Sequence, residues 1–201
     1  MRNLVIIGAG GHGKVCAEIA MAMKKWKNIY FLDDCFPRVR KCLNFEIVGK
    51  TNDFNKFKEA DFFVAIGNNK VRSEFLLTLE KLDINIITLI HPSSIISTYS
   101  KIGDGTSIHQ NAIINTDSKI GRGCIINTNA IVEHENYIDN FVHLSPGVNL
   151  GGQVKIGEYT WLGIGSTVIN NINIDHEVII GANSLILSDI KSAGVYKGLV
   201  K

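Results

Sequence analysis

The sequence lacks any excess of charge. Its 21 Lys and Arg residues stand against 19 Asp and Glu residues, which leaves a net charge of +2 and no basic cluster. This balance excludes the electrostatic footprint of a protein that binds nucleic acid. No apolar run approaches the ~20 residues of a membrane span, and the four apolar residues from Leu4 to Ile7 are too few for a signal peptide. The sequence therefore predicts a soluble cytoplasmic protein.

Cysteine is also scarce, with four residues in the chain. Their spacing is not that of a paired metal site, and their number alone does not imply disulfide bonds. They are Cys16, Cys35, Cys42 and Cys124. A metal held by His134, Glu135 and His143 finds no support in a compact motif. We expect no metal cofactor.

What the sequence has instead is a six-residue repeat. Every sixth position from Ile90 to Ile186 is aliphatic, and none is polar. A second, mostly small residue follows four positions after each aliphatic one. Neither a 3.6-residue helix nor one alternating strand keeps such a period, and a strict repeat this short is typical of stacked β-coils. Three hexapeptides for each coil would give between five and six coils, with the aliphatic positions facing inward.

Before the repeat, strand-like and helix-like patterns alternate. Leu4–Ile7 and residues 29–32 read as strands, and residues 14–25 as a helix. A third unit has a strand over residues 60–66 and a helix over 71–81. This alternation predicts a small parallel sheet with flanking helices. The chain therefore divides into residues 1–88 and residues 89–201.

Three polar or glycine-rich turns follow the predicted strands. They are Gly8-Ala9-Gly10-Gly11-His12-Gly13, Asp33-Asp34 and Gly67-Asn68-Asn69. Because ligands of such sheets bind beyond the carboxyl ends of the strands, we expect these turns to converge there. The first has the G-x-G-x-x-G spacing, which lets backbone N–H groups and a helix N-terminus approach a phosphate. A carboxylate about 20 residues later could take ribose hydroxyls.

The length of the first domain favours a nucleotide or nucleotide sugar over NAD. About 85 residues is closer to one mononucleotide-binding half than to a full dinucleotide fold. His12 also places a titratable donor among the phosphates. A turn whose glycines serve packing alone is the competing interpretation.

In the repeat, the largest departure from the pattern is Val132-Glu133-His134-Glu135-Asn136. A histidine beside a carboxylate is a general-base arrangement. Gly152 lies 18 residues, one coil, after His134 and leaves room for a ligand beside it. The Gly152 N–H or the ring of His143 could stabilise a developing oxyanion. The competing interpretation is a solvated histidine on a polar corner.

These motifs together resemble a known family across essentially the whole chain. The repeat resembles the left-handed β-helix of hexapeptide acyltransferases. Its fusion to the glycine-turn domain resembles sugar acetyltransferases, which include bacillosamine-pathway UDP-4-amino-sugar N-acetyltransferases and sialic-acid O-acetyltransferases. Residues 131–135 and 161–166 carry much of this resemblance. It implies a small α/β Rossmann-like N-terminal domain and a C-terminal left-handed parallel β-helix. It further implies homotrimers with active sites between neighbouring β-helices.

The resemblance also implies residue roles. His134 would be the general base, with Glu135 raising its basicity. The residues expected to contact acetyl-CoA are His143, Gly152, Ile164 and Ala182. The residues expected to hold the nucleotide sugar are Gly10, Gly11, His12, Asp33, Asp34, Gly67 and Asn127.

We therefore expect an acetyl-CoA-dependent N-acetyltransferase for the amine of a UDP-linked 4-amino-deoxy sugar, serving glycan biosynthesis. One alternative keeps the fold and acetylates a hydroxyl, as on sialic acid, although the Asp33-Asp34 pair and the glycine turn favour a UDP-type ligand. Another is a non-catalytic nucleotide-sugar-binding protein, against which the intact His134-Glu135 pair argues. An NAD-dependent protein is a third.

Overall fold

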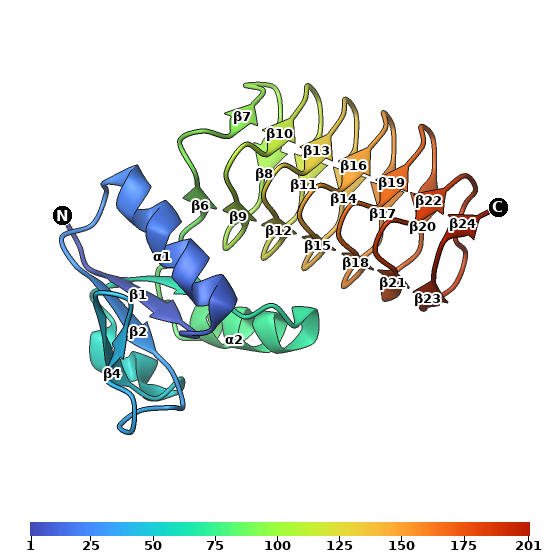
Figure 1. Ribbon diagram of the computed structural model, residues 1–201. Helices are drawn as coiled ribbons and strands as arrows, with labels where there is room; N and C mark the ends of the chain where they lie inside the picture. Colours follow the sequence, from blue (N-terminus) through green and yellow to red (C-terminus); the bar gives the residue numbers. More distant parts are fainter. The chain divides into compact units, whose positions relative to one another are not determined.

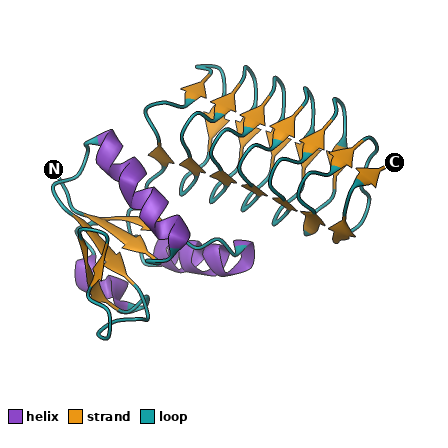
Figure 2. Cartoon of the chain, viewed as in Figure 1, coloured by secondary structure: helices purple, strands orange, loops and turns teal.

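The computed structural model describes all 201 residues, which form two compact units, Met1–Pro92 and Ser93–Lys201. The division falls between Pro92 and Ser93, where the sequence had suggested residues 88 and 89. Helices occur only in the first unit, and the second consists of short strands and turns (Figure 2). None of the helices combines the length and the apolar character that crossing a membrane requires.

The first unit contains a five-stranded sheet in the order β3-β4-β2-β1-β5. The strands are β1 (Leu4–Ile7), β2 (Ile29–Leu32), β3 (Lys41–Cys42), β4 (Phe45–Gly49) and β5 (Asp61–Val64). The helices are α1 (Gly11–Met23), α2 (Asn69–Lys81) and the short η1 (Asp53–Phe57). Only the β3–β4 pair is antiparallel. The parallel sheet with flanking helices is as the sequence predicts.

Alternation along β1 explains the two-sided core. All four β1 side chains are fully buried, as expected for a parallel strand covered on both faces. Leu4 and Ile6 pack in the same cluster as Cys16 and Ile19 of α1. Val5 and Ile7 pack on the other face, together with Leu79 of α2. The carboxyl ends of β2, β1 and β5 therefore lie side by side at one uncovered edge of the sheet.

The second unit is a parallel β-helix with three faces (Figure 1). We name each face by one of its outward residues. The lysine face contains β8 (Lys101–Ile102), β11 (Lys119–Ile120), β14 (Tyr137–Ile138), β17 (Lys155–Ile156) and β20 (Asn173–Ile174). The Ile131 face contains β7 (Ile95–Ile96), β10 (Ile113–Ile114), β13 (Ile131–Val132), β16 (Asn149–Leu150), β19 (Thr167–Val168), β22 (Leu185–Ile186) and β24 (Leu199–Val200).

The third face, the His143 face, continues the same pattern. Its strands are β9 (Ser107–Ile108), β12 (Ile125–Ile126), β15 (His143–Leu144), β18 (Trp161–Leu162), β21 (Val178–Ile180) and β23 (Gly194–Tyr196). The short β6 (Leu89–Ile90) ends the first unit. Ile113, Ile131 and Asn149 pair in register at intervals of 18 residues, which confirms three hexapeptides for each coil.

The inner positions fill the coils and tie them together. Ile114, Val132 and Leu150 are almost completely buried, as the repeat predicts. Small polar residues at inner positions donate to a carbonyl of the next coil, as Ser118 Oγ does to Glu133 O at 2.7 Å. These bonds satisfy groups that would otherwise be buried without partners.

Candidate active-site corner and glycine loops

The turn that joins β13 to β14 carries the histidine and carboxylate that the sequence predicted as a catalytic pair. His134 Nδ1 lies 3.0 Å from Glu135 Oε2, and both side chains are about half exposed, at 50% and 52%. If Nδ1 carries the proton that this bond requires, Nε2 presents a lone pair. The turn thus offers a basic nitrogen at the surface of the β-helix.

Gly152 lies directly under the ring of His134. A Cβ on Gly152 would come within 2.5 Å of His134 Cε1 and 2.6 Å of Nε2, closer than any real Cβ contact. The expectation that Gly152 leaves room for a ligand was therefore wrong in one respect, because the imidazole itself occupies that space. Gly152 is buried, and its N–H donates no hydrogen bond within the chain.

Two residues that the sequence analysis overlooked hold this turn. Gln153 Nε2 donates to Glu135 Oε2 at 3.2 Å. Asn136 is buried, donates from Nδ2 to the carbonyls of Glu133 and Gly151, and accepts from Val154 N at 3.0 Å. The signal for Gln153 was its place 18 residues after Glu135. The signal for Asn136 was a polar amide at an inner position where other coils have Ser, Thr or Val.

His143 lies on a different side of the β-helix. It projects from β15, stacks on Trp161 with ring centroids 5.8 Å apart, and its Nε2 lies 3.4 Å from Asn127 Nδ2. In a three-sided coil, the turn between the Ile131 face and the lysine face is opposite the His143 face. One chain therefore does not bring His143 next to His134.

Ile164 and Ala182 form a column on another corner. They lie in successive turns between the His143 face and the Ile131 face, and Asn183 N donates to Ile164 O at 2.8 Å across the two turns. Ile164 is 60% exposed, so an apolar side chain projects into solvent from this corner.

The glycine loops of the first unit contain open space where side chains would be. A Cβ on Gly10, Gly11 or Gly67 would meet nothing within 4 Å. By contrast, a Cβ on Gly13 would lie 2.0 Å from the Gly8 carbonyl oxygen, and Gly8 has a φ of +100°. The fold therefore explains Gly8 and Gly13 but not the other three. Gly10 is also the N-cap of α1, so the free N–H groups of the helix face this space.

The predicted acidic residues brace these loops. Asp33 accepts from Ala9 N at 2.8 Å and from Cys35 N at 2.9 Å. Partial burial acts to raise the pKa of Asp33, but hydrogen bonds from Cys35 and Ala9 outweigh it and hold the pKa below its ordinary value. Asp34 Oδ1 accepts from the Thr51 backbone and hydroxyl groups. Both carboxylates therefore already connect the strand ends.

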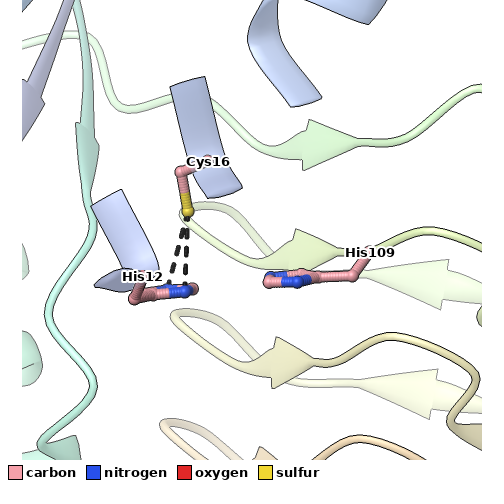
Figure 3. Close-up of side chains that lie close together, drawn as sticks. All are labelled: His12, Cys16 and His109. Atoms are coloured by element: carbon pink, nitrogen blue, oxygen red, sulfur yellow. Dashed lines mark hydrogen bonds between the residues drawn. The ribbon is translucent and has the colours of Figure 1, made fainter. Parts of the chain in front are cut away.

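His12 and Arg72 complete the surroundings of the loops. The ring nitrogens of His12 lie 3.6 and 3.7 Å from Cys16 Sγ, one helical turn later (Figure 3). Arg72 of α2 is fully buried and donates to the carbonyls of Ile66 and Gly67 and to Asn69 Oδ1. The sequence analysis missed Arg72, because a charged residue within a helical pattern is usually solvated.

The chain is similar to known proteins over its whole length. Residues 3–79 match the family described as the PglD N-terminal domain, and residues 99–134 match six bacterial transferase hexapeptide repeats. The acetyltransferase domain of PglB from Neisseria gonorrhoeae FA1090 superimposes with a TM-score of 0.94 at 35% identity, over 98% of this chain and 97% of that chain. The chain belongs to the hexapeptide-repeat sugar acetyltransferase family. It is thus an acyltransferase, and the predicted Rossmann-like domain and left-handed β-helix are confirmed.

Two further relatives of this acetyltransferase indicate the chemistry of the family. A histidine-to-asparagine mutant of perosamine N-acetyltransferase from Caulobacter crescentus was solved with CoA and GDP-perosamine. It superimposes with a TM-score of 0.92 at 30% identity, over 98% of this chain and 93% of that chain. UDP-N-acetylbacillosamine N-acetyltransferase of Bacillus subtilis is 39% identical over 110 residues. That match spans 53% of this chain and half the length of the relative.

Proposed function

We propose that this acetyltransferase transfers the acetyl group of acetyl-CoA to the amine of a nucleotide-linked 4-amino-deoxy sugar, with UDP as the nucleotide. The observation that carries the proposal is the His134–Glu135 pair, with Nδ1 bound to the carboxylate and Nε2 directed away from it. The PglB acetyltransferase domain was solved with acetyl coenzyme A, and the Bacillus subtilis relative acts on a UDP-linked amino sugar.

The proposed reaction uses His134 first as a base and then as an acid. Nε2 takes a proton from the sugar amine as the amine nitrogen attacks the thioester carbon. Glu135 stabilises the imidazolium that forms, because its carboxylate accepts the Nδ1 proton in a hydrogen bond. The C–N bond forms, the C–S bond breaks, and the imidazolium returns its proton to the leaving CoA sulfur. The products are the N-acetylated sugar and free CoA.

Gly152 and His143 are the proposed contacts of the acetyl thioester. The Gly152 N–H has no partner in the chain, and an unpaired buried N–H is unfavourable. A carbonyl oxygen that becomes negative in the transition state would satisfy it. Ile164 and Ala182 are the proposed apolar contacts of the CoA arm, and Asn127, next to His143, contacts the sugar.

The glycine loops are the proposed nucleotide-sugar site. Gly10, Gly11 and Gly67 leave space that the fold itself does not need, and the N-terminus of α1 opens onto it. A diphosphate fits such a site, since free N–H groups and the helix dipole favour negative charge. His12, Asp33 and Asp34 border the loops and would bind the remaining polar groups of the ligand.

A homotrimer with sites between neighbouring chains follows from the proposed roles. His134 and His143 lie on opposite sides of one β-helix, so they can share a site only if two chains supply them. The outward residues also differ between faces. Lys101, Lys119 and Lys155 cover the lysine face, whereas exposed apolar residues lie on the other two. These are Ile95, Leu185 and Leu199 on the Ile131 face, and Trp161, Ile179 and Val195 on the His143 face. Apolar faces of this kind favour association with further copies.

The proposed location is the cytoplasm. All four cysteines are free thiols, which fits a reducing compartment.

An acceptor screen tests the proposed function. The purified protein is mixed with acetyl-CoA and either UDP- or GDP-linked 4-amino sugars, CMP-linked sugars or sialic acid, and released thiol is measured. We expect release with a UDP-4-amino sugar. Release only with GDP-4-amino sugars would change the nucleotide, and release only with a hydroxyl acceptor would establish O-acetylation. No release with any acceptor would contradict the proposal and favour a non-catalytic sugar-binding protein.

A further inference from the structure

Gln153 occupies the same position as Glu135, one coil later. Asp117, Glu135, Gln153 and Asn171 follow one another at intervals of 18 residues, and all four have a left-handed backbone with φ between 56° and 62°. Their side chains therefore leave the corner in the same direction from successive coils. Neighbouring coils are about 4.8 Å apart, so two long side chains in this column can meet. Gln153 Nε2 and Glu135 Oε2 do so, at 3.2 Å.

The oxygen that accepts from Gln153 is also the one that faces His134. Glu135 Oε2 lies 3.0 Å from His134 Nδ1 and 3.2 Å from Gln153 Nε2. A glutamate that is 52% exposed would otherwise sample several rotamers, which costs up to about 2 kcal/mol to restrict. Two donors on one oxygen limit that rotation. Because the second donor is a neutral amide, it adds no charge beside the imidazole.

The backbone holds Gln153 close to this task. Gln153 N donates to the carbonyl of His134 at 3.0 Å, so the main chain of residue 153 is fixed against the histidine turn itself. Beneath it, buried Asn136 bonds to the carbonyls of Glu133 and Gly151, which precede His134 and Gly152 in their coils. The amide of Gln153 thus extends from a rigid base.

We propose that Gln153 is a positioning residue for the acetyl transfer. Its amide fixes the Glu135 carboxylate so that Oε2 accepts from His134 Nδ1, and this keeps the proton on Nδ1 and the lone pair on Nε2. The inference rests on the proposed function, since it assigns Gln153 a role in the state of the proposed base.

The test compares Gln153→Met, which keeps length and removes the donor, with Asn171→Ala. Asn171 lies one coil beyond Gln153 in the same column, is exposed and has no bond to Glu135, so its variant controls for changes to the corner. We expect Q153M to lower kcat by about 3- to 10-fold, as for the loss of one hydrogen bond. KM for both substrates should stay unchanged. N171A should behave as the wild type.

A double-mutant cycle separates positioning from a structural role. In a Glu135→Ala background, Q153M should have no further effect on kcat, because the carboxylate that Gln153 positions is gone. An equal loss of kcat in both backgrounds, or no loss in the wild-type background, would overturn the proposal.

The tautomer of His134 provides a readout that needs no activity. Proton–nitrogen correlation spectra of the ring should show the Nδ1-protonated form in the wild type and a mixture of tautomers in Q153M. An unchanged tautomer in Q153M would contradict the inference even if the rate fell. A wild-type protein that shows the Nδ1-protonated form but releases no thiol would instead contradict the proposed function alone.

Discussion

The imidazole of His134 rests on the Cα of Gly152, where a Cβ would come within 2.6 Å of Nε2. Gly152→Ala must therefore displace the ring, which weakens its bond to Glu135. We expect kcat/KM to fall about 10²-fold, the cost of a misplacement of roughly 1 Å, with the fold intact by circular dichroism. Asn170→Ala, one coil beyond Gly152, is the control and should retain full activity. Normal activity of G152A would show that the ring position seen here is not the catalytic one.

Glycines of the first loop should separate binding from folding. A Cβ on Gly11 meets nothing, whereas one on Gly13 lies 2.0 Å from the Gly8 carbonyl oxygen. Gly11→Ala should leave the melting temperature nearly unchanged and raise KM for the nucleotide sugar by about tenfold, because the methyl group fills space for the ligand. KM for acetyl-CoA should stay the same.

Gly13→Ala provides the matched contrast to G11A. It should destabilise the first unit strongly, because backbone atoms cannot move aside at low cost. If G11A bound the nucleotide sugar normally, the loop would not be the sugar site.

Asp61 should make the first unit sensitive to acid. Burial acts to raise its pKa, but hydrogen bonds from Trp26, Asn85 and Arg2 outweigh it and hold the pKa below the ordinary value. A lowered folded-state pKa gives stability that is fully present above pH ~4 and is lost as the pH falls through the folded value. Denaturant unfolding of a Trp161→Phe protein, followed by Trp26 fluorescence, should show this loss below pH ~4.

The control for the acid effect is Asp61→Asn in the same background. It should be less stable than W161F at pH 7 but lose less stability on acidification. Parallel pH profiles of the two proteins would mean that Asp61 is not the titrating group.

Two inactive variants should complement each other if sites lie between chains. His134→Ala and His143→Ala should each be inactive alone. Chains mixed by unfolding and refolding together would place an intact His134 opposite an intact His143 at about a quarter of the sites of a closed trimer. Recovery of about that fraction of wild-type activity is expected.

The mixing control is H134A refolded with itself, which should stay inactive. Light scattering should give three times the 22.1 kDa chain mass. No recovery from a mixed trimer would place both histidines in one chain's site or remove His143 from the chemistry.

The repeat made most of the fold predictable, because a period of six leaves few choices. Ile114, Val132 and Leu150 lie inside since no other register buries every sixth residue. The corner column of His134 and Gly152 followed from the same arithmetic. The β1 and β2 strands, the glycine turn and the parallel sheet were predictable from local patterns.

Contacts between side chains in successive coils were not predictable in the same way. The bond from Gln153 to Glu135 depends on a left-handed backbone at both residues, which composition does not reveal. The contact of the His134 ring with Gly152 depends on a rotamer. Arg72 was missed because its partners are backbone carbonyls, and these carry no sequence signal.

The most direct test of the account is the rate of thiol release by His134→Ala against the wild type. Both are measured with saturating acetyl-CoA and a saturating UDP-4-amino sugar, after melting curves show that both are folded. Because Nε2 of His134 is the proposed base, kcat should fall by about 10²- to 10⁴-fold. A variant that releases thiol at the wild-type rate would contradict the central claim.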